Sequence, residues 1–179
     1  LILFRNLYNL FKRSYSSGSV TGTVQFTGGL TGHSVYGLFE NTYSTSNVNG
    51  NVRVGGLIGY VTFAGILRHS YSVGSVSGGS ETGGLVGVFG AGGGGAICDN
   101  NFYDTQTSGL TTSSCGTGKT TAEMKQQATF TNWDFISIWA IDEGISYPYF
   151  IQFNPQDQVI LRLSSTSNAH GEVYNQNNY

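Results

Sequence analysis

Three consecutive segments of this chain repeat one another at a constant spacing of 28 residues. Tyr15, Tyr43 and Tyr71 occupy equivalent positions, and the residues on either side of them align without a gap. A unit of this length cannot bury an apolar face by itself, so neighbouring units have to stack on one another. The repeat therefore predicts a solenoid.

The repeat contains columns of similar residues that are candidates for the core. A fourth, less regular unit begins at Ile97, and it is displaced by the glycine-rich tract 91–95, which lengthens the third unit. Because residues in one column stack directly on one another in a solenoid, these columns predict the structural core. The predicted core residues are Tyr15, Tyr43, Tyr71 and Phe102, then Val20, Val48 and Val76, then Leu30, Leu57 and Leu85.

The period fits one coil of a parallel β-helix. Leucine-rich repeats have a similar length, but their Leu-x-x-Leu-x-Leu spacing is missing. In a β-helix the columns stack at roughly 4.8 Å, the distance between neighbouring strands. Parallel crossover connections are almost always right-handed. We therefore expect an all-β, right-handed parallel β-helix in which the glycine columns mark positive φ angles or close backbone contacts.

Composition narrows the classes of partner. Only 10% of the residues are charged, the net charge is −2, and the eight basic residues are scattered. A nucleic-acid surface needs clustered Lys and Arg, so none is expected. No apolar run approaches the length of a membrane span, so insertion by this chain is not expected either.

The repeat resembles the GLUG repeat, which is named for its Gly-Leu-hydrophobic-Gly core. That core stands here as Gly56-Leu57-Ile58-Gly59 and as Gly84-Leu85-Val86-Gly87, and a Ser-Tyr-Ser-x-Gly-x-Val element appears at 14–20 and 70–76. Thr31 and Ser46 depart from the pattern. The resemblance, which covers roughly residues 10–150, implies large bacterial or archaeal surface proteins, including adhesin-like chains and non-catalytic regions of surface peptidases. It offers no catalytic residues.

The chain divides into three parts. Repeats are expected over 1–118, with units near 10–37, 38–65, 66–96 and 97–118, followed by a C-terminal cap over 119–153. Residues 154–179 are interpreted as a linker or the start of a further module that begins with a strand over 158–163. The apolar opening without an initiating Met indicates that further domains of the same polypeptide precede it.

The cap is predicted to contain a short helix over 121–127. Thr120 and Glu123 form a capping box, and Met124 and Ala128 would face the core. The dense aromatic segment that follows would cover the open end of the solenoid, because unpaired strand edges invite aggregation. Alternatively, its aromatics form a sugar-binding platform. The residues assigned to the cap are Trp133, Trp139 and Tyr149.

Several short motifs suggest a nucleotide, glycosidase or calcium site, but each lacks residues that such a site requires or has a simpler structural explanation. The Gly-Lys-Thr at 118–120 would need a glycine at Ser113 to be a phosphate-binding loop. Glycoside hydrolysis needs a held pair of carboxylates, and none of the acidic residues recurs at one column. Calcium binding by Asp99 and Asp104 with the asparagines between them is an alternative to ordinary Asx turns. The acidic candidates are Asp99, Asp104, Asp134, Asp142 and Glu143, and the histidines without metal spacing are His33, His69 and His170.

Cys98 and Cys115 have no partner that would complete a zinc site. They either form a disulfide that closes a surface loop or remain separate thiols, and a disulfide fits an extracellular setting. We predict no catalytic, cofactor-binding or metal-binding residue. The expected function is a secreted or cell-surface adhesin or structural spacer, which contacts a glycan or a protein on a host or neighbouring cell. A carbohydrate-binding region of a larger polysaccharide-acting or peptidase surface protein is the alternative, and catalysis within this chain is a third reading.

Overall fold

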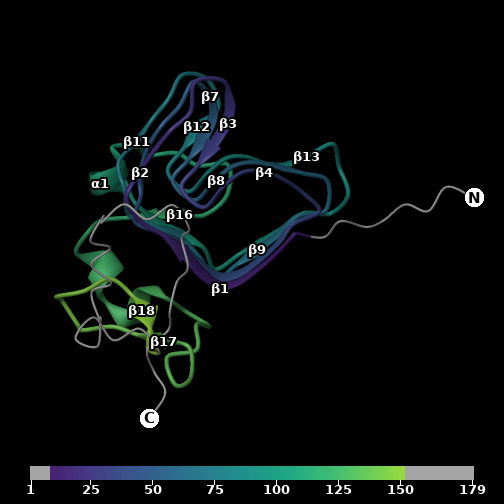
Figure 1. The fold of residues 1–179 in the computed structure, drawn as a ribbon. Helices are drawn as coiled ribbons and strands as arrows, with labels where there is room; N and C mark the ends of the chain where they lie inside the picture. Colours follow the sequence, from purple (N-terminus) through teal and green to yellow (C-terminus); the bar gives the residue numbers. More distant parts are fainter. Residues whose placement is uncertain (1–8, 152–179) are drawn as a thin grey trace, which may run out of the picture.

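The structure, a computed structural model, describes residues 9–151 and is a β-solenoid of about three turns with a spacing near 28 residues. In Figure 1 the chain runs clockwise as it recedes from the viewer, so the coils wind to the right. The first coil contains β1 (Leu10–Ser16), β2 (Ser19–Thr21), β3 (Gln25–Gly28) and β4 (Thr31–Val35). The second contains β5 (Leu38–Ser44), β6 (Asn47–Asn49), β7 (Val52–Gly55) and β8 (Ile58–Thr62).

The third and fourth coils are less regular. The third contains β9 (Ile66–Arg68), β10 (Tyr71–Ser72), β11 (Val76–Ser77), β12 (Thr82–Gly83) and β13 (Val86–Ala91). The fourth contains β14 (Ile97–Asp99), β15 (Phe102–Asp104), the short helix α1 (Thr105–Ser108) and β16 (Thr117–Lys119). All strands of the coils pair in parallel and build four sheets along the solenoid. The predicted fold class is confirmed.

Strand register follows the sequence columns. Tyr43 pairs with Tyr15 on one side and with Tyr71 on the other, and Tyr71 pairs with Phe102. Val48 pairs with both Val20 and Val76 in the same way. The spacing of the repeat therefore determines which backbone atoms pair between coils.

A single backbone conformation bends each coil in the middle of the first sheet. Arg13, Asn41, His69 and Asn100 occupy one column, and all four have a φ near +50°. A left-handed residue interrupts the alternation of side chains, because it turns the strand by more than a pleated residue would. The bend is the lower vertex of the outline in Figure 1. After this bend the side chains of the tyrosine column point to the outer face of the sheet, away from the interior of the solenoid.

The glycines of the Gly-Leu-hydrophobic-Gly motif are not needed for a left-handed backbone, since none of them has a positive φ. Close contacts explain them instead. A Cβ on Gly56 would lie 2.3 Å from the carbonyl oxygen of Gly84, and one on Gly59 would lie 2.7 Å from that of Arg53. No side chain fits at such distances. The motif therefore lets two sheets of one coil meet at a sharp re-entrant corner.

Two apolar clusters fill the interior. The larger lies between the first and fourth sheets and consists of Phe39, Leu57, Ile58, Val61, Leu67, Leu85, Val86, Tyr103 and Cys115. A narrower cluster lies between the second and third sheets and consists of Val48, Val54 and Val76, with Leu110 packed against it. The predicted valine and leucine columns thus line the interior, except in the first coil, where Val20 and Leu30 are only half-buried because the second coil covers them from one side alone.

Three members of the tyrosine column are buried as predicted, but they belong to a third apolar cluster that the coils form together with the cap. Tyr43, Tyr71 and Phe102 are buried on the outer face of the first sheet, under residues from the cap. Tyr15 is 43% exposed, because the described part of the cap packs over the second, third and fourth coils. We name the outer column of Tyr15, Tyr43, Tyr71 and Phe102 the aromatic ladder.

Residues 105–119 close the end of the solenoid. The hydroxyl of Ser113 accepts hydrogen bonds from the backbone N–H groups of Leu85 and Val86, and the N–H of Gly84 donates to Thr112. These contacts satisfy backbone groups that a further coil would otherwise pair. The expectation that the aromatic segment seals the end is wrong, because this earlier loop occupies that position.

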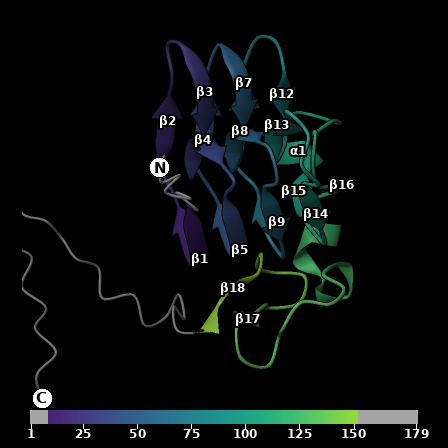
Figure 2. The same ribbon diagram turned by 90° about the vertical axis from the view of Figure 1, so that its right-hand side faces the viewer.

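The cap flanks the solenoid. It contains two 3₁₀ turns, η1 (Glu123–Lys125) and η2 (Gln127–Thr129), and an antiparallel pair of β17 (Trp139–Ala140) and β18 (Tyr149–Phe150). Figure 2 shows it running back beneath the coils, with β18 below β5. The predicted α-helix over 121–127 is therefore wrong, although Glu123 accepts from the N–H of Thr120 as in a capping box. Gln126 is extended and ends the first turn, so the chain buries Met124 and Phe130 and leaves Ala128 exposed.

Candidate functional site

The aromatic side chains of the cap pack against the rings of the aromatic ladder. Trp139 is fully buried, packs 6.0 Å from the rings of Tyr43 and Tyr71, and donates its indole N–H to the side chain of Asn41. Trp133 donates to the backbone oxygen of Asn100. Because these indoles are buried and hydrogen-bonded, the structure does not present them as a sugar-binding platform.

Tyr149 differs from the two tryptophans. It is half-buried, and its hydroxyl lies 3.5 Å from Asp142 on the surface, whereas the neighbouring Phe150 is buried against Tyr43 and Trp139. The inward-facing residue of this strand is therefore Phe150. Alternation along the strand, together with the buried Pro148 that precedes it, explains why the predicted cap residue lies at the edge.

The acidic candidates hold loops together. Asp104 is fully buried, caps α1 through the N–H groups of Gln106 and Thr107, and accepts from the hydroxyls of Thr121 and Tyr147. Burial, reinforced by this contact, raises the pKa of Tyr147 to about 12. The carboxylate is therefore a structural hydrogen-bond acceptor that joins the fourth coil to the cap.

The other carboxylates are spread over separate turns. The hydroxyl of Ser137 and the N–H groups of Ser137 and Ile136 donate to Asp134, and these hydrogen bonds lower the pKa of its carboxyl. Asp99 lies on the surface next to Asn100, whose side-chain amide donates to it. Asp142 lies in the turn closed by Ser146, and Glu143 accepts from the N–H of Gln127.

The suggested calcium ligands are not brought together. Asp104 points into the joint with the cap, and Asn101 is buried, where its side-chain amide donates to the backbone oxygen of Leu67. Within residues 9–151, no group of three His, Cys, Asp or Glu side chains could hold a metal ion. His170 and the predicted strand 158–163 lie outside the described residues. The described residues also include no helix long and apolar enough to cross a membrane.

Cys98 and Cys115 form a disulfide in the structure. Cys98 lies on β14 at the surface, whereas Cys115 is buried in the larger interior cluster. The bond fastens the loop that closes the solenoid end to the fourth coil. The residues after it form β16, which pairs with β15, so the Gly-Lys-Thr segment is a strand rather than a phosphate-binding loop.

The re-entrant corner between the third and fourth sheets carries a cluster that sequence analysis missed. Phe26 and Tyr60 stack at 5.0 Å, and His33 lies 5.0 Å from Tyr60. The guanidinium of Arg53 lies 4.6 Å from the Tyr60 ring centre and forms an ion pair of 2.8 Å with Glu81. We name these five residues the aromatic corner.

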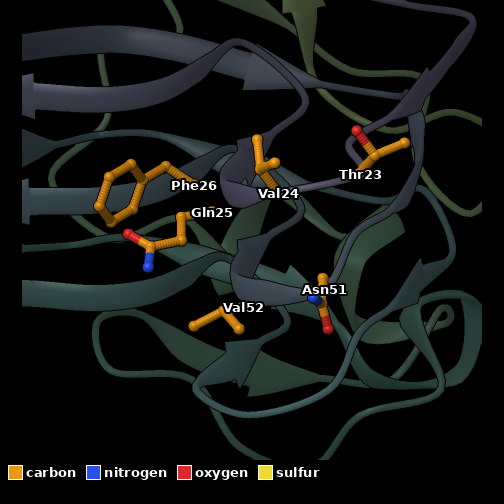
Figure 3. Close-up of a pocket in the computed structure, with 6 residues that line it drawn as sticks. All are labelled: Thr23, Val24, Gln25, Phe26, Asn51 and Val52. Atoms are coloured by element: carbon orange, nitrogen blue, oxygen red, sulfur yellow. The ribbon is translucent and has the colours of Figure 1, made fainter.

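The aromatic corner borders a shallow depression of about 560 Å³ between the first two coils. Figure 3 shows the side chains of Phe26 and Gln25 on the same side of β3, with Val52 on the neighbouring coil below them. The lining residues are Thr23, Val24, Gln25, Phe26, Asn51 and Val52. The depression therefore combines an aromatic ring with two amide side chains and a hydroxyl.

The sequence contains no repeated pattern that would predict the aromatic corner. Phe26, Arg53 and Glu81 share a column, and each has a φ between +53° and +63°. Their chemical types differ from coil to coil, so the column does not appear as a repeat feature. A search for positions at which the type changes while the neighbouring glycines stay constant would have identified it. No family model, no curated protein and no solved structure matches this chain.

Proposed function

We propose that this chain is a non-catalytic repeat module of a secreted or cell-surface protein of the GLUG-repeat type, which acts as a rigid spacer and contact surface in adhesion. The observation that carries the proposal is the stacking of equivalent coils in register. Such stacking yields a rod whose surface recurs from coil to coil, as extended binding surfaces of solenoids do.

The way the side chains are used supports this proposal. The five candidate carboxylates lie in different turns, and each of them accepts a hydrogen bond from the backbone or a side chain of its own surroundings. The disulfide fits an oxidising environment, because such bonds persist mainly outside the cytosol. Low charge and tight glycine contacts favour a stiff rod over a hinged catalytic cleft.

Beads coated with the folded chain should test adhesion directly. We expect them to be retained under flow on a layer of bacterial or host cells in larger numbers than beads coated with albumin or with the heat-unfolded chain. Retention no greater than that of the albumin beads would contradict an adhesive role.

Catalysis is tested separately with soluble polysaccharides. The chain is expected to release no reducing ends or unsaturated products from them. Turnover that disappears in Asp99→Asn or Asp134→Asn, two exposed carboxylates whose substitution leaves the core intact, would overturn the non-catalytic proposal.

A further inference from the structure

The depression beside the aromatic corner is lined by an aromatic ring and by polar side chains from both coils. Within residues 9–151, no hydrogen bond occupies the side chains of Thr23, Gln25 or Asn51. Some other exposed polar side chains of the coils are occupied, since Ser75 and Ser77 donate to the side chains of Asn47 and Asn49. The three free side chains are therefore available to an external ligand.

Phe26 is held in place before any ligand arrives. Its ring stacks on Tyr60 with an angle of 9° between the planes, and His33 supports it at 4.9 Å. The guanidinium of Arg53 lies 5.4 Å from its centre. Its left-handed backbone, with φ of +63°, fixes the direction of the side chain further. A ring that is already ordered loses little entropy when it binds a partner.

The charges of the corner favour an uncharged partner. Arg53 directly follows the lining residue Val52 in the chain, and its guanidinium is neutralised by Glu81 at 2.8 Å. An acidic ligand would have to compete with this carboxylate, and a basic one would meet the guanidinium. A ligand with an apolar face and many hydroxyl groups matches the aromatic ring, the amides and the neutral surroundings together.

We infer that this depression binds a hexose unit of a neutral glycan. The sugar ring packs its C–H face against Phe26, and its hydroxyl groups exchange hydrogen bonds with Gln25, Asn51 and Thr23. The volume lies within the range of about 300 to 1,000 Å³ that small-molecule sites occupy. The inference rests on the proposed adhesive function, for which it names the ligand class and the surface.

Nuclear magnetic resonance of the ¹⁵N-labelled full chain tests the site. We expect titration with cellohexaose, mannohexaose or chitohexaose to shift amide signals of residues 23–26 and 51–53 for at least one of the three. Affinity should persist at high salt, because no net charge is involved. No shift with any of the three overturns the inference. So do shifts confined to another face, or binding of heparin alone that salt abolishes.

Matched variants identify the residues responsible. Phe26→Ala is expected to weaken binding at least about tenfold, as is Gln25→Ala combined with Asn51→Ala, which leaves the ring stack intact. Phe63→Ala is the control, because Phe63 is also a stacked, partly exposed aromatic with a left-handed backbone, on the corner next to Tyr36. Equal affinity of all variants would overturn the assignment.

The two proposals fail in different ways. If bead adhesion survives Phe26→Ala and no glycan shifts the amide signals of residues 23–26 and 51–53, the adhesive function stands and the glycan site falls. If the oligosaccharide binds as expected but beads are not retained, the site stands and the adhesive function falls.

Discussion

At the scale of single residues, this fold depends on glycines that have ordinary φ angles. Gly59 lies where a Cβ would be 2.6 Å from the oxygen of Gly32 and 2.7 Å from that of Arg53. Backbone atoms on both sides cannot move without breaking the register of two coils. These positions exclude side chains by space alone, whereas the left-handed corners of each coil are occupied mostly by residues with large side chains.

Gly59→Ala is therefore expected to destabilise the protein by about 3 kcal/mol or more, at the upper end of overpacking effects. Gly95→Ala is the control, because a Cβ there meets no atom within 4 Å and only its φ of +73° opposes the change, at a cost of about 1 kcal/mol. Urea unfolding of both variants measures the difference. Equal losses would show that the contacts at Gly59 relax easily.

The buried phenols make stability depend on alkaline pH. Burial raises the pKa of Tyr43 to about 12, and that of Tyr147 is raised to about 12 by burial and by Asp104. In the unfolded chain both titrate near about 10, so their contribution is complete below that pH and is lost as pH rises towards 12. We expect the free energy of unfolding to fall above about pH 10. The combined Tyr43→Phe and Tyr147→Phe variant should show a shallower fall, and an unchanged slope would contradict the assignment.

At the scale of elements, the disulfide stabilises the loop that ends the solenoid. It joins residues 17 apart, and closing a loop of that length is worth about 3 kcal/mol in the chain-entropy model. The variant with both Cys98→Ala and Cys115→Ala is expected to lose about that much in urea unfolding. Reductant should weaken the parent chain and leave the variant unaffected. A variant as stable as the parent would show that packing alone holds the loop.

The elements also show what the sequence could predict. The period determined the coil, the parallel pairing and the register, because identical side chains stack only when equivalent residues are opposite one another. The side of the sheet occupied by Tyr43 was not predictable, since it depends on the left-handed Asn41 two residues earlier, and other coils place Arg13 or His69 there. The cap was recognised by its aromatic residues, but its position depends on contacts between distant segments.

At the scale of the whole molecule, the cap protects a lateral face. Tyr43, Tyr71 and Phe102 lie on neighbouring coils, and Met124, Phe130, Trp133, Trp139 and Phe150 cover them. The hydroxyl of Tyr71 also donates to the backbone oxygen of Pro148. Removing the cap would therefore expose a continuous strip of aromatic rings along the rod.

A chain that ends at Thr120 is expected to form oligomers in size-exclusion chromatography and to bind a hydrophobic dye, because exposed apolar strips associate. The same truncation with Tyr43→Thr, Tyr71→Thr and Phe102→Thr should be monomeric, since threonine suits a solvated strand. If the unsubstituted truncation is monomeric, the ladder does not need its cover. If both truncated chains form oligomers, the surface through which they associate is the end of the solenoid and not the aromatic ladder.

The glycine-rich segment between the third and fourth coils has a consequence for engineering. Ala91 pairs with Thr62 before it, after a one-residue shift in register next to Phe89, and Ile97 pairs with Ile66 after it. The extra residues are therefore extruded, and strand pairing continues on both sides of them. Because each doubling of loop length costs only about 0.6 kcal/mol, a foreign epitope inserted after Gly93 should leave the rod folded. The molecule thus already contains a display position, at which length and composition can vary independently of the rest of the scaffold.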